Sequence, residues 1–115
     1  MTPVNINNSD PEISQSELLI PSNQIFSSSV RFSVMLILYV YHTAKVKELQ
    51  KLLQISAGKL DHHIRRLEEA KYIEKRKIFL IARPTIKIIM TKHGKQSFEK
   101  YLSTLKGVLD RVDIL

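Results

Sequence analysis

The sequence predicts a mainly α-helical fold with a small antiparallel β-hairpin, and this prediction depends on three observations. Apolar residues recur every three or four positions between residues 29 and 70, and again after residue 91, as in helices. Between these stretches the apolar period falls to two, which is typical of strands. The 115 residues are enough for one domain, and 43% hydrophobic with 25% charged residues is typical of a folded globular protein.

The chain is expected to begin with a flexible leader over residues 1–24, because this stretch is rich in Asn, Ser and Pro. A helix is predicted from Ser29 to about Thr43, where apolar residues are dense and charges are few. We expect such a helix to be buried on most sides. It lies in a domain that we expect to cover residues 25–91.

Two short helices are predicted next, with a three-residue break between them. The first covers residues 46–53, where four apolar residues form one stripe: Val46, Leu49, Leu52 and Leu53. Ser56 suits the N-cap of the second helix, which is expected to run for about fourteen residues. The buried face of this helix would carry Leu60, Ile64 and Leu67, at spacings of four and three.

A β-hairpin is predicted after Ala70. Residues 72–80 and 85–91 are rich in Ile and short of helix signals, which favours two strands. The segment Ala82-Arg-Pro84 between them is typical of a turn.

The helical period returns after Thr91 with a heptad seam, which predicts a C-terminal dimerisation helix over residues 92–115. The residues of this seam, spaced 4, 3, 4 and 3, are Phe98, Leu102, Leu105, Leu109 and Val112. A small domain gains stability from pairing, and the symmetry of a homodimer matches palindromic DNA. The alternative is that the seam packs within the chain, against the buried helix near Val34.

Several classes of protein are excluded by what the sequence lacks. The absence of Cys excludes disulfides, thiol catalysis and Cys-based zinc sites, and it fits a cytoplasmic protein. No targeting signal is recognisable, and no apolar run approaches the ~20 residues that span a membrane. We expect no enzymatic activity and no cofactor, because the chain has no glycine-rich phosphate loop. His62 and His63 would point about 100° apart on a helix, so no metal site is expected.

Positive charge is concentrated in the middle of the chain. The net charge is +7, from 18 Lys and Arg against 11 Asp and Glu. Residues 45–100 alone hold an excess of nine cations, so the flanks are neutral or acidic. A concentrated basic segment in a folded domain suggests a polyanionic partner, most commonly nucleic acid. A solvated lysine-rich surface is the alternative.

The order of the predicted elements is that of a helix-turn-helix followed by a wing, which is a DNA-binding arrangement. The far side of the second helix is polar and basic enough to enter a major groove. Gly58 would let the backbone approach a phosphate, and Lys59 stands in the first turn although the helix dipole disfavours a cation there. The candidate DNA-binding residues of this helix are Ser56, Gly58, Lys59, His62, His63, Arg65 and Arg66.

The hairpin carries a second set of candidate DNA-binding residues, which are Lys75, Arg76, Lys77, Arg83 and Lys87. They would line a phosphate track, with Arg83 at the tip as a minor-groove finger. Strand residues alternate in direction, so Lys75 and Lys77 share one face and Arg76 takes the other. The alternative is a charged hairpin edge that discourages aggregation.

Four short motifs resemble those of one known family. They are Val46-Lys-Glu-Leu49, Ile55-Ser-Ala-Gly-Lys-Leu60, Leu67-Glu-Glu-Ala-Lys-Tyr-Ile-Glu74, and Arg83-Pro84 followed by Met90-Thr-Lys-His-Gly94. On these motifs, the chain from about Val30 to Leu109 resembles the winged helix-turn-helix regulators related to the MarR group, particularly their small archaeal members. The resemblance implies a dimeric transcription regulator, with the helix from Ser56 to Ala70 in the major groove and the wing beside or in the minor groove.

The sequence departs from that family at two places. Lys71 stands where the family usually has a Gly that ends the recognition helix in a left-handed turn. The strip Ile78-Phe-Leu-Ile-Ala82 is apolar where relatives are often polar, so it would contact either DNA or protein.

The combined prediction is a sequence-specific, double-stranded DNA-binding transcription regulator that acts as a homodimer. Two alternatives remain: a chromatin-like architectural protein without sequence preference, and a protein-protein adaptor of the transcription machinery. Whether the protein binds a small-molecule effector is left open by the sequence. Tyr39, Tyr41 and Tyr101 could line a pocket at a dimer interface, although aromatic residues at helical spacing are more often part of the core.

Overall fold

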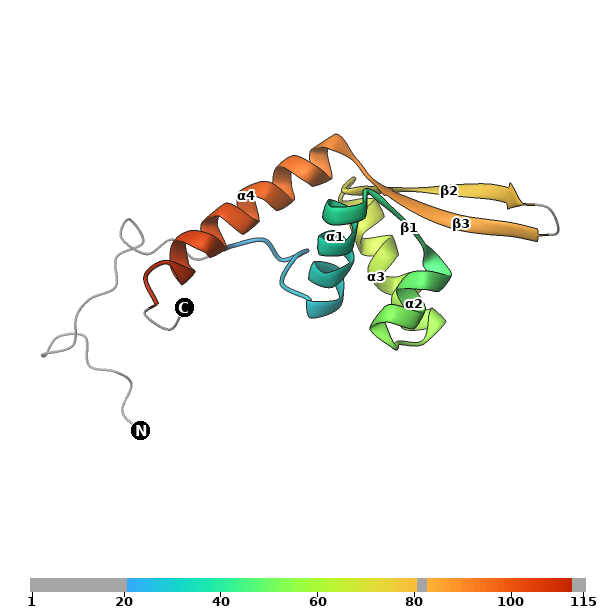
Figure 1. Ribbon diagram of the computed structural model, residues 1–115, viewed down its shortest axis with the longest axis horizontal. Coiled ribbons are helices and arrows are strands. Elements are labelled where there is room, and N and C mark those ends of the chain that lie inside the picture. Colours follow the sequence, from blue (N-terminus) through green and yellow to red (C-terminus); the bar gives the residue numbers. More distant parts are fainter. Residues whose placement is uncertain (1–20, 81–82, 113–115) are drawn as a thin grey trace, which may run out of the picture.

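The structure is a computed structural model that describes residues 21–80 and 83–112. Its elements in chain order are α1 (Ser29–Tyr41), β1 (Thr43–Lys45), α2 (Val46–Leu53), α3 (Ala57–Glu69), β2 (Ile73–Leu80), β3 (Arg83–Met90) and α4 (Lys92–Leu109), as Figure 1 shows. This mainly α-helical fold with an antiparallel hairpin confirms the predicted fold class. Residues 1–20 of the expected leader lie outside the described part of the chain. Within that part, no helix combines the length and the apolar character that crossing a membrane requires.

The three strands form one antiparallel sheet in the order β1-β3-β2. β2 and β3 pair along their whole length, from Ile73 opposite Met90 to Leu80 opposite Arg83. Arg83 and Pro84 therefore belong to β3, and the prediction that they form the turn is wrong. β1 is an addition to the predicted hairpin. It has only three residues, and its partner strand lies far along the chain, so no local sequence pattern predicts it.

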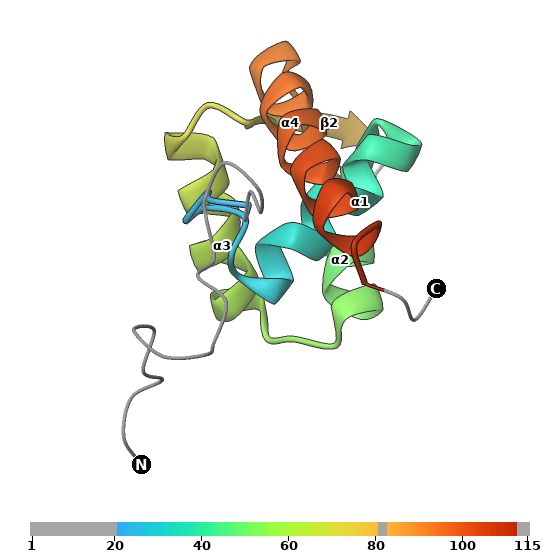
Figure 2. The same cartoon turned by 90° about the vertical axis from the view of Figure 1, so that its left-hand side faces the viewer.

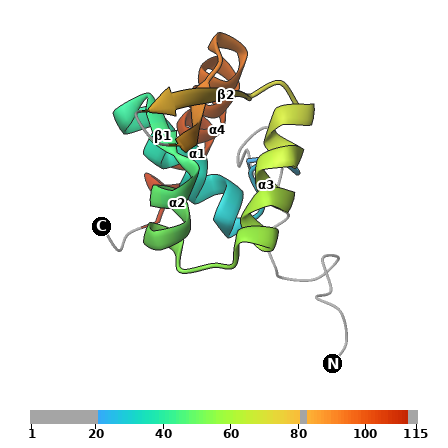
Figure 3. The ribbon, with the colours of Figure 1, turned by 90° about the vertical axis from the view of Figure 1, so that its right-hand side faces the viewer.

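The hydrophobic core is built around α1, whose residues Val34, Met35 and Leu38 are fully buried. Figure 3 shows α1 in the middle of the molecule, with the sheet and the other helices around it. The outer face of α1 is open, because Val40 is 59% exposed and Tyr41 is 71% exposed. Most of the other residues of the helix are buried or half-buried, which confirms the prediction that it is buried on most sides. The buried core residues are Phe26, Val34, Met35, Leu38, Leu49, Leu60, Ile64, Leu67, Tyr72, Ile73, Ile88 and Phe98.

Residues 21–28 form a turn that closes the core, and this turn crosses the predicted boundary between leader and domain at residues 24 and 25. Phe26 is 1% exposed, and its ring stacks on Tyr72 at a centroid distance of 4.9 Å. Asn23 holds the turn, because its side-chain oxygen accepts from the amides of Ile25 (2.9 Å) and Phe26 (3.3 Å). Figure 2 shows this segment passing between α3 and α4. The segment before α1 therefore contributes directly to the fold.

Helix α3 ends in a left-handed turn at Lys71, whose φ is 63°. The amide of Tyr72 donates to the carbonyl of Leu67 (3.0 Å), and the amide of Lys71 donates to that of Glu68 (2.9 Å). This pair of bonds is the Schellman motif, in which Gly is the usual left-handed residue. Lys71 thus takes the left-handed conformation that Gly favours, at the position where the family that the sequence resembles usually has a Gly.

Helix α4 ends at Leu109, earlier than the predicted end at residue 115. Val112 lies beyond the helix, in a turn where its amide donates to the carbonyl of Leu109 (3.0 Å). The prediction that the helix continues through Val112 is therefore wrong. Residues 113–115 lie outside the described part of the chain.

Gly94 allows α4 to start against the turn that follows α3. A Cβ at this position would lie 2.1 Å from the carbonyl oxygen of Tyr72. Thr91 caps the helix by accepting from the Gly94 amide (2.9 Å), and its own amide donates to the same Tyr72 carbonyl (3.0 Å). Only Gly fits here, because the opposing atoms belong to a hydrogen-bonded backbone that cannot move aside.

Replacing Gly94 by Ala is therefore expected to lower the free energy of unfolding by about 2 kcal/mol, since the added methyl overpacks the α3-α4 junction. Gly107→Ala is the matched control in the same helix, because no atom lies within 4 Å of the position its Cβ would take. The free energy of unfolding of that variant should rise by roughly 0.5–1 kcal/mol, because Ala has a higher helix propensity than Gly. Urea denaturation followed by circular dichroism measures both. Equal stability of the two variants would contradict the close approach at Gly94.

Candidate nucleic-acid interface

Helix α3 has one apolar and one polar face. Leu60, Ile64 and Leu67 are buried in the core, as predicted. Ser56 is the N-cap, and its hydroxyl accepts from the Lys59 amide (3.2 Å), which confirms the sequence prediction. The exposed residues from the predicted set are Ser56, Gly58, Lys59, His62, Arg65 and Arg66. The structure therefore brings six of the seven candidate residues of this helix to solvent.

The cations on this face differ in whether a carboxylate of the protein already forms an ion pair with them. Arg65 forms an ion pair with Asp61, one turn earlier on the helix, so part of its charge is already neutralised. Within residues 21–80 and 83–112, Lys59 and Arg66 have no carboxylate at ion-pair distance. The positive potential of the exposed face therefore rests mainly on Lys59 and Arg66.

His63 takes a different position from its neighbours on α3. Its Nδ1 lies 2.9 Å from a terminal nitrogen of Arg31 on α1. A guanidinium only donates, so His63 Nδ1 is the acceptor and the neutral ring carries its proton on Nε2. The Nε of Arg31 also donates to the carbonyl of Ile25 (2.7 Å). His63 thus joins α3 to α1 and to residues 21–28, so this ring nitrogen is turned away from the exposed face.

The surroundings of His63 oppose its protonation. Burial lowers its pKa below the ordinary value of 6.5, and the charges of Arg31 and His62 lower it further. The pKa of Arg31 is itself lowered, first by burial and then by Arg66. Sequence reasoning did not single out Arg31. The available signal was that it is the one charged residue within the apolar helix α1.

The wing divides its predicted DNA-binding residues between two faces. Lys75 and Lys77 alternate with Arg76, so the first two share one face of β2. Lys75 also reaches back to Glu68 of α3, with 3.7 Å between Nζ and Oε1. Figure 1 shows the hairpin projecting from the helical body with its root beside α3. The wing root and α3 therefore form one continuous surface, whereas Arg83 lies at the far end of the hairpin.

Like charges face each other across the wing. Arg76 and Lys87 are directly opposite in the β2-β3 register. Such a pair weakens a hairpin. Glu74 offsets little of this repulsion, because its carboxylate is 3.6 Å from Arg76 in an exposed pair. An anion such as a phosphate, placed beside the two cations, would relieve the repulsion.

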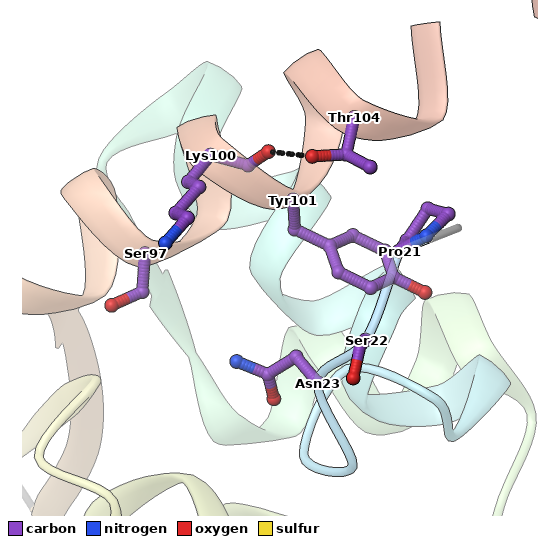
Figure 4. Close-up of a pocket in the computed structure, with 7 residues that line it drawn as sticks. All are labelled: Pro21, Ser22, Asn23, Ser97, Lys100, Tyr101 and Thr104. Carbon is purple, nitrogen blue, oxygen red and sulfur yellow. Dashed lines mark hydrogen bonds between the residues drawn. The ribbon is translucent and has the colours of Figure 1, made fainter. Parts of the chain in front are cut away.

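The three tyrosines considered for an effector pocket have different surroundings in the described part of the chain. Tyr39 donates to Glu99 Oε2 (2.7 Å), and this hydrogen bond raises the pKa of the tyrosine. Tyr41 borders a separate groove between α1 and α2. Tyr101 lines a cavity of about 430 Å³ between α4 and the segment before α1, shown in Figure 4. The residues lining that cavity are Pro21, Ser22, Asn23, Ser97, Lys100, Tyr101 and Thr104.

Known proteins share this arrangement. A model of the winged helix DNA-binding domain family matches residues 30–109. An uncharacterized protein from Methanocaldococcus jannaschii is 30% identical over 79 residues, which cover 69% of this chain and 86% of that protein. The solved structure of a transcriptional regulator homologue from Pyrococcus horikoshii OT3 matches with a TM-score of 0.75 and 31% identity, over 81% of this chain and 92% of that one. The crystal structure of MarR has the same fold at 21% identity, with a TM-score of 0.64 over 75% of this chain and 62% of that one.

The lowered pKa of His63 predicts that the stability of the folded protein depends on pH. Unfolded His63 takes up a proton near pH 6.5, whereas the folded residue does so only at lower pH. Stability should therefore be lost as the pH falls below about 6.5, and the loss should level off below the folded pKa. We expect the thermal midpoint of the wild-type protein to fall more between about pH 7.5 and 5.5 than that of His63→Gln, whose amide oxygen still accepts from Arg31.

His62→Gln is the matched control, because it removes a neighbouring, exposed imidazole from the same helix. Its thermal midpoint should depend on pH nearly as strongly as that of the wild-type protein. If His63→Gln and the wild-type protein lose the same stability at low pH, the Arg31-His63 contact does not respond to protonation.

Proposed function

The chain belongs to the winged helix DNA-binding domain family, and we propose that it is a sequence-specific transcription regulator that binds double-stranded DNA as a homodimer. The family and fold are those of transcriptional regulators rather than enzymes. The observation that carries the proposal is the exposed face of α3, where Lys59 and Arg66 lie within the described chain without a carboxylate partner. The absence of Cys fits a regulator that acts in the cytoplasm.

We assign α3 to the major groove. Lys59, His62 and Arg66 are spaced three and four residues apart, so they lie on one side of the helix. Lys and Arg pair with the O6 and N7 of guanine, which gives base discrimination. At Gly58 no atom lies within 4 Å of the position a Cβ would occupy, so the backbone at the helix N-terminus is open to a phosphate.

We assign the wing to the phosphate backbone and the neighbouring minor groove. Lys77 and Lys87 supply charge along the hairpin, and Arg83 supplies it at the distal end. The like-charge pair of Arg76 and Lys87 supports this assignment, because a phosphate between neighbouring cations removes their repulsion.

We place the dimer contact on the C-terminal half of α4, which Figure 1 shows extending away from the wing and past the rest of the helical body. Two residues of the predicted seam are engaged within the chain, since Phe98 is fully buried and Leu102 packs against the core. Leu105 is half-buried, and Leu109 and Val112 are each 39% exposed. The proposed contact is therefore smaller than the predicted seam and consists of Leu105, Leu109 and Val112.

Base readout and phosphate contact are separable by mutation. Lys59→Ala should change which sequences are bound, at a loss of about 1–3 kcal/mol for the preferred site, whereas Lys87→Ala should weaken all sequences alike. Selection from random DNA gives the preferred site, and fluorescence anisotropy on that site and a scrambled duplex measures both effects. Lys92→Ala, an exposed cation at the start of α4, is the control that should change neither.

The same titrations test the other candidate functions. A dimer that makes roughly 6–10 phosphate contacts should lose about 10³–10⁵ in affinity between 50 and 200 mM salt. Equal affinity for preferred and scrambled DNA would favour an architectural protein. Absence of DNA binding at low salt would favour a protein-protein adaptor.

Leu109→Lys should separate the subunits without unfolding them, because Leu109 is already partly exposed in one chain and its replacement would place two cations near the dimer axis. Light scattering should report a monomer, and DNA affinity should fall because two linked half-sites become independent. Ser103→Lys adds the same charge to an exposed position of α4 off the seam, and it should remain a dimer. A dimeric Leu109→Lys protein with full affinity would place the contact elsewhere.

A further inference from the structure

We propose that the wing inserts the ring of Phe79 into the minor groove and unstacks a base step, so that the protein bends the DNA that it binds. The inference rests on the proposed function and adds a second way of recognising sequence. DNA that kinks easily at the insertion point would be preferred, even where no side chain reads a base edge.

The exposure of Phe79 is the first observation. Its side chain is 77% exposed, whereas Phe26 and Phe98 are fully buried. Phe79 stands opposite Pro84 in the register, and Ile86, which is 42% exposed, is the diagonal neighbour on the same face. Phe79, Pro84 and Ile86 form an apolar tip, and all three are exposed in the described part of the chain.

The reach of the wing is the second observation. β1 pairs with β3 only as far as Lys87, so the hairpin beyond that point projects as a two-stranded ribbon. Phe79 lies four residues beyond Lys75, which contacts Glu68 of α3. Four strand residues span about 14 Å. Adjacent grooves of DNA are separated by about half a helical turn, or roughly 17 Å, so a helix in the major groove brings this ring to the next minor groove.

The positive charge around the tip favours DNA as its binding partner. Lys77 shares the face of Phe79, and Arg83 stands at the distal end of β3. Glu74, near the root, is the one carboxylate in β2 and β3. A second copy of the wing would bring like charges together, whereas phosphates on both sides of a minor groove match the cations. Apolar wedges flanked by Lys and Arg are the means by which minor-groove proteins kink DNA.

The test compares the wild-type protein with Phe79→Ala on a duplex of about 30 base pairs that carries the selected site and a fluorophore at each end. Energy transfer reports the bend, and 2-aminopurine at successive positions beside the site reports unstacking. The wild-type protein should bend the duplex by roughly 20–90° and raise 2-aminopurine fluorescence at one step. Phe79→Ala should abolish both signals and change affinity by less than about tenfold, because burial of the ring and unstacking of the bases offset each other.

Two matched variants distinguish loss of the aromatic wedge from a general loss of DNA affinity. Phe79→Leu keeps an apolar wedge and should keep most of the bend, whereas Lys87→Ala should bind less tightly and bend fully. All variants change exposed or half-exposed residues, so circular dichroism should show an unchanged fold.

The outcomes distinguish this inference from the proposed function. If the wild-type protein binds DNA but Phe79→Ala bends it equally, or neither bends it, the wedge is overturned and the proposed function stands. If the wild-type protein binds no DNA at low salt, both fail. If Phe79→Ala changes the mass of the free protein in light scattering, the ring makes a contact between copies, and the wedge is again overturned.

Discussion

Four parts of the molecule meet at Tyr72, and the position of each depends on the backbone and ring of that residue. The Tyr72 carbonyl accepts from the Thr91 amide and lies against Gly94, which fixes the start of α4. Its ring stacks on Phe26, and its hydroxyl accepts from Asn23 (3.0 Å), which fixes the segment before α1. Because Tyr72 also stands between α3 and β2, this one junction orients the helix and the wing together. The surface proposed for DNA thus takes its geometry from contacts on the opposite side of α3.

A second contact, between Arg31 and His63, fixes the orientation of α3 on the side that faces α1. Arg31 is the one charged residue of α1, and it links His63 of α3 to the carbonyl of Ile25. The contact is polar and directional, whereas the hydrophobic contribution of Leu60 and Ile64 has no preferred direction. Arg31 and His63 therefore add a defined orientation to a helix that the core already holds in place.

Local patterns were sufficient for the parts of the fold that depend on neighbours in sequence. Apolar spacing predicted the helices, and Ser56 was identified as an N-cap from the residue type and the position alone. β1 was missed because its pairing is set by β3, far along the chain. Phe26 was missed because a single aromatic residue in a polar stretch has no period. At the candidate interface, sequence found the exposed cations but not the Arg31-His63 bond, since nothing local relates residues on two separate helices.

The projecting wing has a consequence for the thermodynamics of recognition. Beyond Lys87 the two strands pair only with each other, and Arg76 faces Lys87 near the point where β1 ends. Isolated two-stranded hairpins are marginally stable in water, so this ribbon opens to solvent more often than the strands at the core. A bound polyanion would quench that motion, and the entropy lost would offset part of the favourable enthalpy of the new contacts. A complex held in this way would be weaker than its contacts alone suggest, because ordering the wing uses part of their free energy.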